Sequence, residues 1–232
     1  DLVAQTSLPA LLRLHDEAGR AAAAVEEDLF DKVAVVPLRF HDSDDASCLN
    51  PNRALQPGLL GVDPVLLRGR FGRSRGGHGD DLETALGATG PDPTDIPAVG
   101  DEATVIWGLG LAPGRRLEVT DENGRTRFLW IAGVVPNATF QGSLLIPQDR
   151  FVDLFPSEGG WRRWMVDVPP ASRPALTATL ERLLGDPGLE ITDTHERLAL
   201  LASVENQYLQ LFLVLGGLAL GLGTAGFLAV AA

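Results

Sequence analysis

The residues best suited to chemistry lie together in the run HDSDDASC, from His41 to Cys48. The run combines an imidazole, three carboxylates and a thiol, which are the ligand types that zinc and calcium use. Calcium loops need ligands at alternate positions, a glycine and a distal glutamate, whereas zinc sites need paired cysteines and histidines. Neither pattern is present. We therefore interpret His41–Asp45 as an acidic turn and assign no role to Cys48, leaving an anchored metal-dependent hydrolase as the weakest alternative.

Other reactive side chains are scattered along the chain. The four histidines stand at positions 15, 41, 78 and 195, and the sequence contains no GxSxG, HExxH or phosphate-binding Gly-Lys-Ser/Thr motif. Ser143 has a neighbouring glycine but lacks the nucleophile motif, so a serine at a strand end is expected. The sequence thus predicts no catalytic residue, no cofactor and no metal site, and the protein is not expected to be an enzyme.

The charge of the chain is acidic and unevenly distributed. Aspartate and glutamate number 31 against 19 lysines and arginines, and every charged side chain precedes residue 206. Nucleic-acid binding needs clustered basic residues, and the only cluster, Arg68–Arg75, runs into GGHGDD and is interpreted as a solvated loop. The composition therefore predicts no nucleic-acid partner and an acidic globular part followed by an apolar segment.

The apolar segment has the length of a membrane helix. Leu211–Ala232 comprises 22 residues without charge or proline, which as a helix extend roughly 33 Å and exceed a hydrocarbon core of about 30 Å. A lipid-anchor signal behind the spacer ASVENQYLQ is the lesser alternative. We predict a transmembrane helix over 207–232 that contacts the lipid bilayer. Its small residues at every fourth position form a packing face for other helices: Gly217, Gly221, Ala225 and Ala229.

The segment before this span is predicted to be helical as well. Asp193 can cap the first turn, with Glu196 completing a capping box. No proline or glycine occurs from Thr194 to Leu215, so one helix of about 39 residues, roughly 58 Å long, is expected. Such a helix would couple the outer part of the protein rigidly to the membrane. The residues assigned to this coupling helix are Glu196, Val204, Glu205, Asn206, Tyr208 and Phe212.

The polar part, residues 1–206, mixes strand and helix signals. Helix formers occupy 19–30, and KVAVVPLRF reads as a strand whose end is marked by Pro37. Residues 41–64 and the Gly/Pro-rich stretch 73–101 are predicted to be loops. Asn123-Gly124 predicts a hairpin, followed by strands at 143–147 and 161–168 and helices at 148–155 and 172–184. The second strand alternates, with Trp164, Val166 and Val168 on one face, and the second helix has Leu176, Leu180, Leu183 and Leu184 as its apolar residues. A short strand LEIT completes an α+β, or mixed α/β, fold.

Three stretches resemble one family: DDASCLNPNRALQPGLLGVDP, FQGSLLIPQDRFVDLFPSEGGWRRWMVDV and ERLALLASVENQYLQLFLVLGGLALGLGTAGFLAVAA. They are similar to bacterial ABC-transporter permeases of the FtsX and MacB type. The resemblance extends from about residue 42 to 232 and leaves 73–97 unmatched. It implies a two-lobed extracytoplasmic domain, with a membrane-proximal lobe of about 1–39 and 143–206 and an inserted lobe of about 40–142.

The resemblance also implies a function. A cytoplasmic ABC ATPase subunit would hydrolyse ATP, and the permease, as a dimer or pseudo-dimer in the cell membrane, would transmit that motion to the outer domain. The cargo would be a lipid, lipoprotein or peptide, or the domain would control an outer partner. A preceding span and the helix that meets the ATPase are missing, and the absent initiator methionine indicates a segment of a longer protein. The alternative is a membrane-anchored binding or sensor domain without an ATPase.

Overall fold

The computed structural model divides the chain into two compact units, Asp1–Asp193 and Thr194–Ala232. Each unit is considered by itself below. The structure describes residues 2–30, 32–42, 57–69, 81–136, 138–194, 210 and 212–220.

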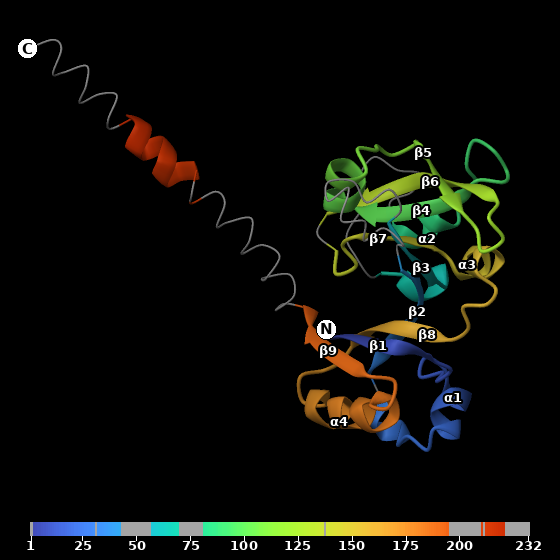
Figure 1. Cartoon of the computed structure of the whole chain (residues 1–232). Coiled ribbons are helices and arrows are strands. Elements are labelled where there is room, and N and C mark those ends of the chain that lie inside the picture. The colour runs from blue at the N-terminus through green and yellow to red at the C-terminus, as the bar shows by residue number, and fades with distance from the viewer. Residues whose placement is uncertain are drawn as a thin grey trace, which may run out of the picture. The chain divides into compact units, whose positions relative to one another are not determined.

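The first unit is built on one mixed sheet, and its described residues contribute nine strands in the order β5-β6-β4-β7-β3-β2-β8-β1-β9 (Figure 1). Most neighbouring strands are antiparallel, whereas β3–β7 and β4–β6 are parallel. This arrangement confirms the predicted α+β class. The strands are β1 (Leu2–Ala10), β2 (Ala34–His41), β3 (Gly58–Val62), β4 (Ile96–Asp101), β5 (Arg116–Thr120), β6 (Thr126–Val135), β7 (Ser143–Pro147), β8 (Trp161–Asp167) and β9 (Leu189–Asp193).

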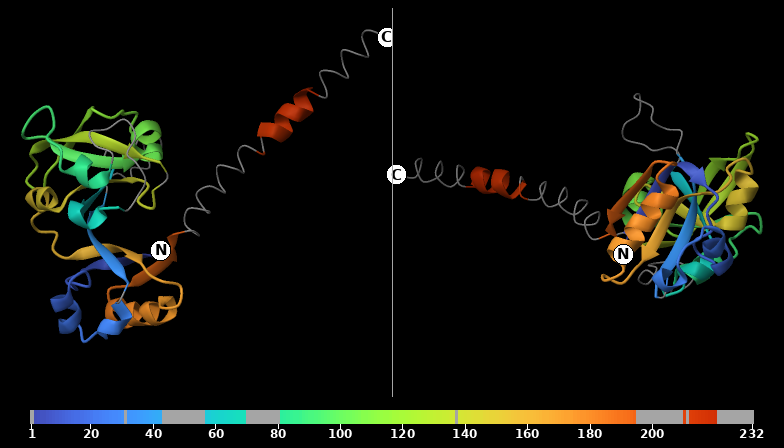
Figure 2. Two further views of the ribbon diagram at one scale, coloured as in Figure 1. Left: turned by 180° about the vertical axis from the view of Figure 1, so that it is seen from behind. Right: turned by 90° about the horizontal axis from the view of Figure 1, so that it is seen from below.

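Short helices accompany the sheet. They are α1 (Glu17–Ala22), α2 (Leu82–Leu86), α3 (Gln148–Leu154) and α4 (Arg173–Leu184), with the 3₁₀ helices η1 (Glu27–Phe30) and η2 (Pro64–Leu67) and a π-helix η3 (Ala103–Gly108). The helix formers of 19–30 are divided between α1 and η1, because Ala24 between them adopts a positive φ of 51°. Figures 1 and 2 show α1 and α4 on the same side of β1, β8 and β9.

Strand β2 connects two halves of the sheet. Its residues Ala34–Leu38 pair with β8, and Arg39–His41 pair with β3. We call β1, β8, β9, α1, α4 and Ala34–Leu38 the α4 half, and β3–β7, α2, α3 and Arg39–His41 the hairpin half. Pro37 was expected to end this strand but lies inside it. The strand tolerates a residue without N–H here because β2 pairs with β3 only from Arg39 onward, leaving one side free of ladder partners.

Three hydrophobic clusters hold the unit together. One belongs to the α4 half, where Trp164, Val166 and Val168 pack with α4, as the alternation in β8 predicted. A second belongs to the hairpin half and surrounds Phe151. The remaining cluster spans both halves, because Met165 on the opposite face of β8 packs with residues of β3 and β6. The middle of strand β8, from Trp164 to Val166, is therefore buried on both faces.

The predicted hairpin is confirmed. Strands β5 and β6 are antiparallel with Thr120 opposite Thr126. Asp121 accepts hydrogen bonds from the backbone N–H groups of Asn123 and Arg125, at 3.0 and 2.9 Å. Gly124 has a φ of 75°, a left-handed conformation that glycine adopts without steric cost. The bond from Arg125 is the main reason that the pKa of Asp121 lies below its ordinary value.

Two predicted loops contain regular structure instead. The stretch 73–101 includes α2 and β4, and 41–64 includes β3; β1 was not predicted at all. Strands β3 and β4 are buried along their whole length, so they show no alternation of polar and apolar residues. Gly100 in β4 lies so close to its neighbours that a Cβ there would come within 2.6 Å of Leu144 and Val105. Glycine in this stretch therefore serves close packing as well as turns.

The division into two lobes remains a prediction. Strand β7 was assigned to the membrane-proximal lobe, but it pairs with β3 and β4 in the hairpin half. Helix α3 follows β7 directly and packs against β3. We therefore propose to move the second boundary of the inserted lobe from residue 142 to about residue 155.

Candidate functional site

The first unit ends at Asp193, on the sheet edge that β1 and β9 form. The two strands are antiparallel, with Leu2 opposite Asp193 and Thr6 opposite Leu189. The beginning and the end of the first unit consequently lie side by side, and Figure 1 shows the N-terminus beside β9. Any force on the chain at one of these ends acts on a strand that is hydrogen-bonded to the other.

An ion pair fixes the last residue of this edge to the adjacent helix. Arg173 Nη1 donates to Asp193 Oδ2 at 2.5 Å, and the carboxylate side chain is 18 % exposed. Arg173 is the first residue of α4, so the pair joins the start of that helix to the end of β9. Asp193 was predicted to cap the following helix; its proposed partner, Glu196, lies outside the described residues.

Helix α4 provides the support behind this ion pair. Leu176, Leu180 and Leu184 recur at four-residue spacing and are buried against the sheet, as predicted from the sequence. Ser172 occupies the N-cap position, but its side chain makes no capping hydrogen bond. The helix is thus held by its apolar stripe, and the site at the β1–β9 edge rests on a packed layer.

Most of the predicted coupling and packing residues lie outside the part of the chain that the structure describes. These are Glu196, Val204, Glu205, Asn206, Tyr208, Gly221, Ala225 and Ala229. Of the others, Phe212 and Gly217 belong to a helical stretch at 212–220, where Phe212 is 69 % exposed and a Cβ at Gly217 would meet no atom within 4 Å. The coupling and packing roles stay predictions.

Within the described ranges, no helix is both long enough and apolar enough to cross a membrane. The predicted transmembrane helix over 207–232 falls largely on residues outside those ranges.

The reactive run near His41 is only partly described. His41 Nδ1 lies 2.5 Å from Glu158 Oε1, and its ring stacks on Phe155 with centroids 3.8 Å apart. Residues 43–48, including Cys48, lie outside the described residues. The described part of the chain contains no group of three or more histidine, cysteine, aspartate or glutamate side chains that could hold a metal ion.

One open cavity of about 320 Å³ lies between α2, the start of β4 and the start of α3. Four prolines contribute to its wall, and its buried carboxylate, Asp95, is engaged by Arg116 and by the backbone N–H of Asp92. That carboxylate is committed to holding the β5 strand. The other charged side chains in the cavity wall, Asp149 and Arg150, are exposed and lie 3.9 Å apart.

Sequence reasoning missed a buried carboxylate at the start of the π-helix. Asp101 accepts hydrogen bonds from the backbone N–H and the hydroxyl of Thr104, at 2.7 and 3.0 Å. Burial raises the pKa of Asp101, although these hydrogen bonds oppose the shift. The Thr104 hydroxyl also accepts from the backbone N–H of Gly142 at 2.7 Å. Asp101 therefore organises the junction of β4, η3 and β7, and the D-x-x-T spacing was the available sequence signal.

Comparison with known proteins shows that this chain is similar to two solved structures, among others. One is the periplasmic region of MacB from Actinobacillus actinomycetemcomitans, 15 % identical with a TM-score of 0.42, covering 88 % of this chain and 92 % of that chain. The other is the extracellular domain of the noncanonic ABC-type transporter YknZ from Gram-positive bacteria, 14 % identical with a TM-score of 0.41, covering 83 % and 100 %. The chain matches no family model and no curated protein sequence. Likeness at such TM-scores carries no argument about function.

Proposed function

We propose that this chain is the extracytoplasmic domain, with the following membrane helix, of an ABC-transporter permease of the FtsX/MacB type. The observation that carries the proposal is the pairing of β1 with β9, which brings Leu2 and Asp193 together. A domain inserted between two membrane helices must return its two ends to one place, and this edge does so. The resemblance of residues 196–232 to the helix that leaves such domains supports the same interpretation.

The proposed role is mechanical. A cytoplasmic ATPase would move the membrane helices, and the helix predicted from Thr194 would carry that movement to β9. The Arg173–Asp193 ion pair would then pass it to α4 and the packed layer behind it. In this role residues 1–206 lie outside the cell membrane, the span contacts lipid, and two permease units form a dimer or pseudo-dimer. The exported or extracted cargo would be a lipid, lipoprotein or peptide, or the motion would control an outer partner.

The topology can be tested with the natural cysteine, because Cys48 is the only one in the chain. Intact cells producing the full chain would be treated with a membrane-impermeant maleimide. We expect labelling at Cys48 before lysis. A Cys48→Ser variant is the matched control for labelling. Labelling that occurs only after lysis would overturn the proposed topology.

The alternative is a membrane-anchored binding or sensor domain that works without an ATPase. Reading the gene beyond both ends separates the two functions. Further predicted spans and a neighbouring ATPase gene, with co-purification of that ATPase and the permease, support the proposed function. A reading frame that stops soon after Ala232 and an absence of any ATPase partner would instead establish the anchored domain.

A further inference from the structure

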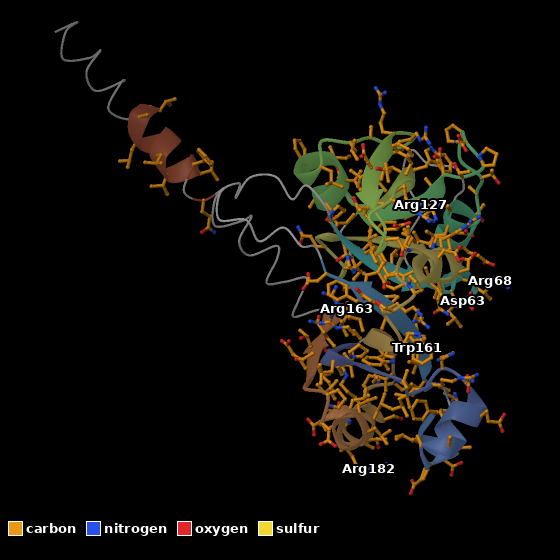
Figure 3. The ribbon with its side chains drawn as sticks, turned by 45° about the vertical axis from the view of Figure 1, so that its right-hand side comes forward. Asp63, Arg68, Arg127, Trp161, Arg163 and Arg182 are labelled. Atoms are coloured by element: carbon orange, nitrogen blue, oxygen red, sulfur yellow. The ribbon has the colours of Figure 1, made fainter. Side chains whose placement is uncertain are left out.

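The two halves of the sheet are connected by few crossings of the chain. Within the described residues the chain passes between them inside β2, at Leu38–Arg39, and again through Phe155–Gly160, which joins α3 to β8. We call Phe155–Gly160 the connector. Figure 3 shows Trp161, which follows the connector, at the level where one half gives way to the other. The contacts between β2 and the connector therefore bear on the orientation of the halves.

Two side chains of β2 bind the same residue of the connector. Arg39 Nη1 donates to the backbone carbonyl of Glu158 at 2.8 Å, and His41 Nδ1 lies 2.5 Å from Glu158 Oε1. Because an ionised carboxylate can only accept hydrogen bonds, His41 carries the proton at Nδ1 and donates it. The partners are separated by 119 and 117 residues in sequence. The first crossing is thus tied directly to the second.

Aromatic rings hold both donors in position. The His41 ring is stacked on Phe155 with an interplanar angle of 14°. The Arg39 guanidinium lies over Trp161, with Cζ 5.8 Å from the ring centroid. Arg39 is half-buried, and this burial lowers the pKa of its guanidinium. A partly desolvated guanidinium and a partly buried imidazole form stronger hydrogen bonds than the same groups in open solvent.

The last two residues of the connector, Gly159 and Gly160, have the backbone properties that a pivot needs. Gly159 would accept a Cβ without meeting any atom within 4 Å, so it is loosely packed. Gly160 has a φ of 77°, and a Cβ there would lie 2.8 Å from the carbonyl oxygen of Ala10. The loosely packed Gly159 is thus adjacent to the constrained Gly160. Rotation at Gly159 can change the direction of the chain while Gly160 stays seated on β1.

Few contacts of the hydrophobic clusters oppose a change in the angle between the two halves. One cluster is confined to the α4 half and another to the hairpin half. The cluster that spans both halves reaches the α4 half through three side chains, Val36, Leu38 and Met165. Methionine is the most adaptable of apolar side chains because of its three flexible torsions. Movement of one half against the other would therefore disturb a small part of the packed interior.

We propose that Arg39, His41 and Glu158 form a clasp that fixes the angle between the α4 half and the hairpin half, and that opening the clasp lets the halves move about Gly159–Gly160. This inference goes beyond the proposed transport function, since it concerns the first unit alone. A domain with such a clasp has two arrangements that a ligand or a partner could select between. The clasp is a positioning device and touches no substrate.

The test measures the distance between the halves in the full chain. Spin labels on Asn123→Cys in the hairpin and Arg182→Cys in α4, in a Cys48→Ser background, report the angle by double electron–electron resonance. Both label sites are exposed. A second pair, Thr84→Cys with Asn123→Cys, lies within the hairpin half and is the control for local unfolding.

The variants separate the polar bond from the packing around it. His41→Phe keeps a ring to stack on Phe155 but cannot donate, and Glu158→Gln keeps the size of the side chain without its charge. Loss of a charged hydrogen bond should raise the ratio of displaced to native arrangements about tenfold. The double variant should be no more displaced than His41→Phe alone, because Glu158→Gln weakens the same bond that His41→Phe removes. Glu17→Gln, an exposed site on α1, is the matched charge control.

A broadened distance between the halves, with an unchanged distance within the hairpin half, is the expected result. If the single variants keep the distribution of the parent chain, the clasp does not set the angle. If the control pair broadens as well, the residues stabilise the fold as a whole and the clasp is refuted as a separate device. Neither result bears on the proposed transport function, because no ATPase or membrane assay enters the comparison.

Discussion

Replacing Leu180 by alanine should destabilise the layer that supports the β1–β9 edge. Leu180 is 1 % exposed and packs in the cluster of the α4 half. The substitution removes three carbons, which at about 0.8 kcal/mol each corresponds to roughly 2.4 kcal/mol of lost transfer free energy. The cavity left behind adds to this, because a packed interior relaxes only partly. We expect the free energy of unfolding to fall by about 3 kcal/mol.

The assay is urea unfolding of the full chain in detergent, followed by tryptophan fluorescence, since Trp164 belongs to the same cluster. For a unit of this size a loss of about 3 kcal/mol lowers Tm by about 6–12 °C. Glu181→Ala, at the next and exposed position of α4, should change the free energy of unfolding by less than about 0.5 kcal/mol. A loss below about 1 kcal/mol for Leu180→Ala, or equal losses for both variants, would refute the assignment of α4 as the supporting layer.

Three further outcomes are expected. In the proposed permease, a proline at Val204 or Tyr208 should abolish transport without reducing ATP binding by the proposed ATPase partner, because it breaks the predicted coupling helix; continued transport would show that this helix does not transmit the motion. Burial raises the pKa of Asp101 in the folded state, so its contribution to stability is complete below the unfolded pKa and declines as the pH rises through the folded pKa. Asp101→Asn should therefore flatten the fall of the urea midpoint as the pH rises above the ordinary carboxyl pKa of 3.8, and parallel profiles would contradict this. Gly61→Ala would place a Cβ 2.6 Å from Phe151 and should cost about 1–3 kcal/mol in thermal unfolding; an unchanged Tm would show that α3 can shift.

The features predicted correctly from the sequence were those that neighbouring residues determine. Asn123-Gly124 predicted the β5–β6 turn because the required positive φ is a property of the glycine itself. The leucines of α4 and the alternation around Trp164 likewise predicted the buried faces of a helix and a strand, since each pattern repeats with the period of its own element. In these cases the residues that decide the structure are a few positions apart.

Strands β3 and β4 were missed for a physical reason. Both are buried on both faces, so they lack the alternation that marks a half-exposed strand, and both contain glycine. Gly100 is required by the side chains of Leu144 and Val105, which come from other elements. A residue chosen for close packing looks like a turn residue when only its neighbours in sequence are considered.

The candidate site was predictable in part. The sequence indicated that residues near Asp193 join the globular part to an apolar helix, but the ion pair with Arg173 depends on how α4 packs. The function of His41 was not predictable. Its acidic neighbours in sequence suggested a turn or a metal site, whereas in the structure its bond goes to Glu158.

The sequence by itself determined the properties that accumulate along the chain: the net charge of −12, the uncharged stretch from residue 206 onward, the α+β class and the positions of the strongest turns. Only the tertiary structure decided which segments meet. The pairing of β1 with β9, the pairing of β2 with β8 and the clasp at Glu158 each join residues more than a hundred positions apart. Such contacts form because burying the strands of one sheet satisfies their backbone groups and apolar faces together, and no local pattern encodes which distant strand does so.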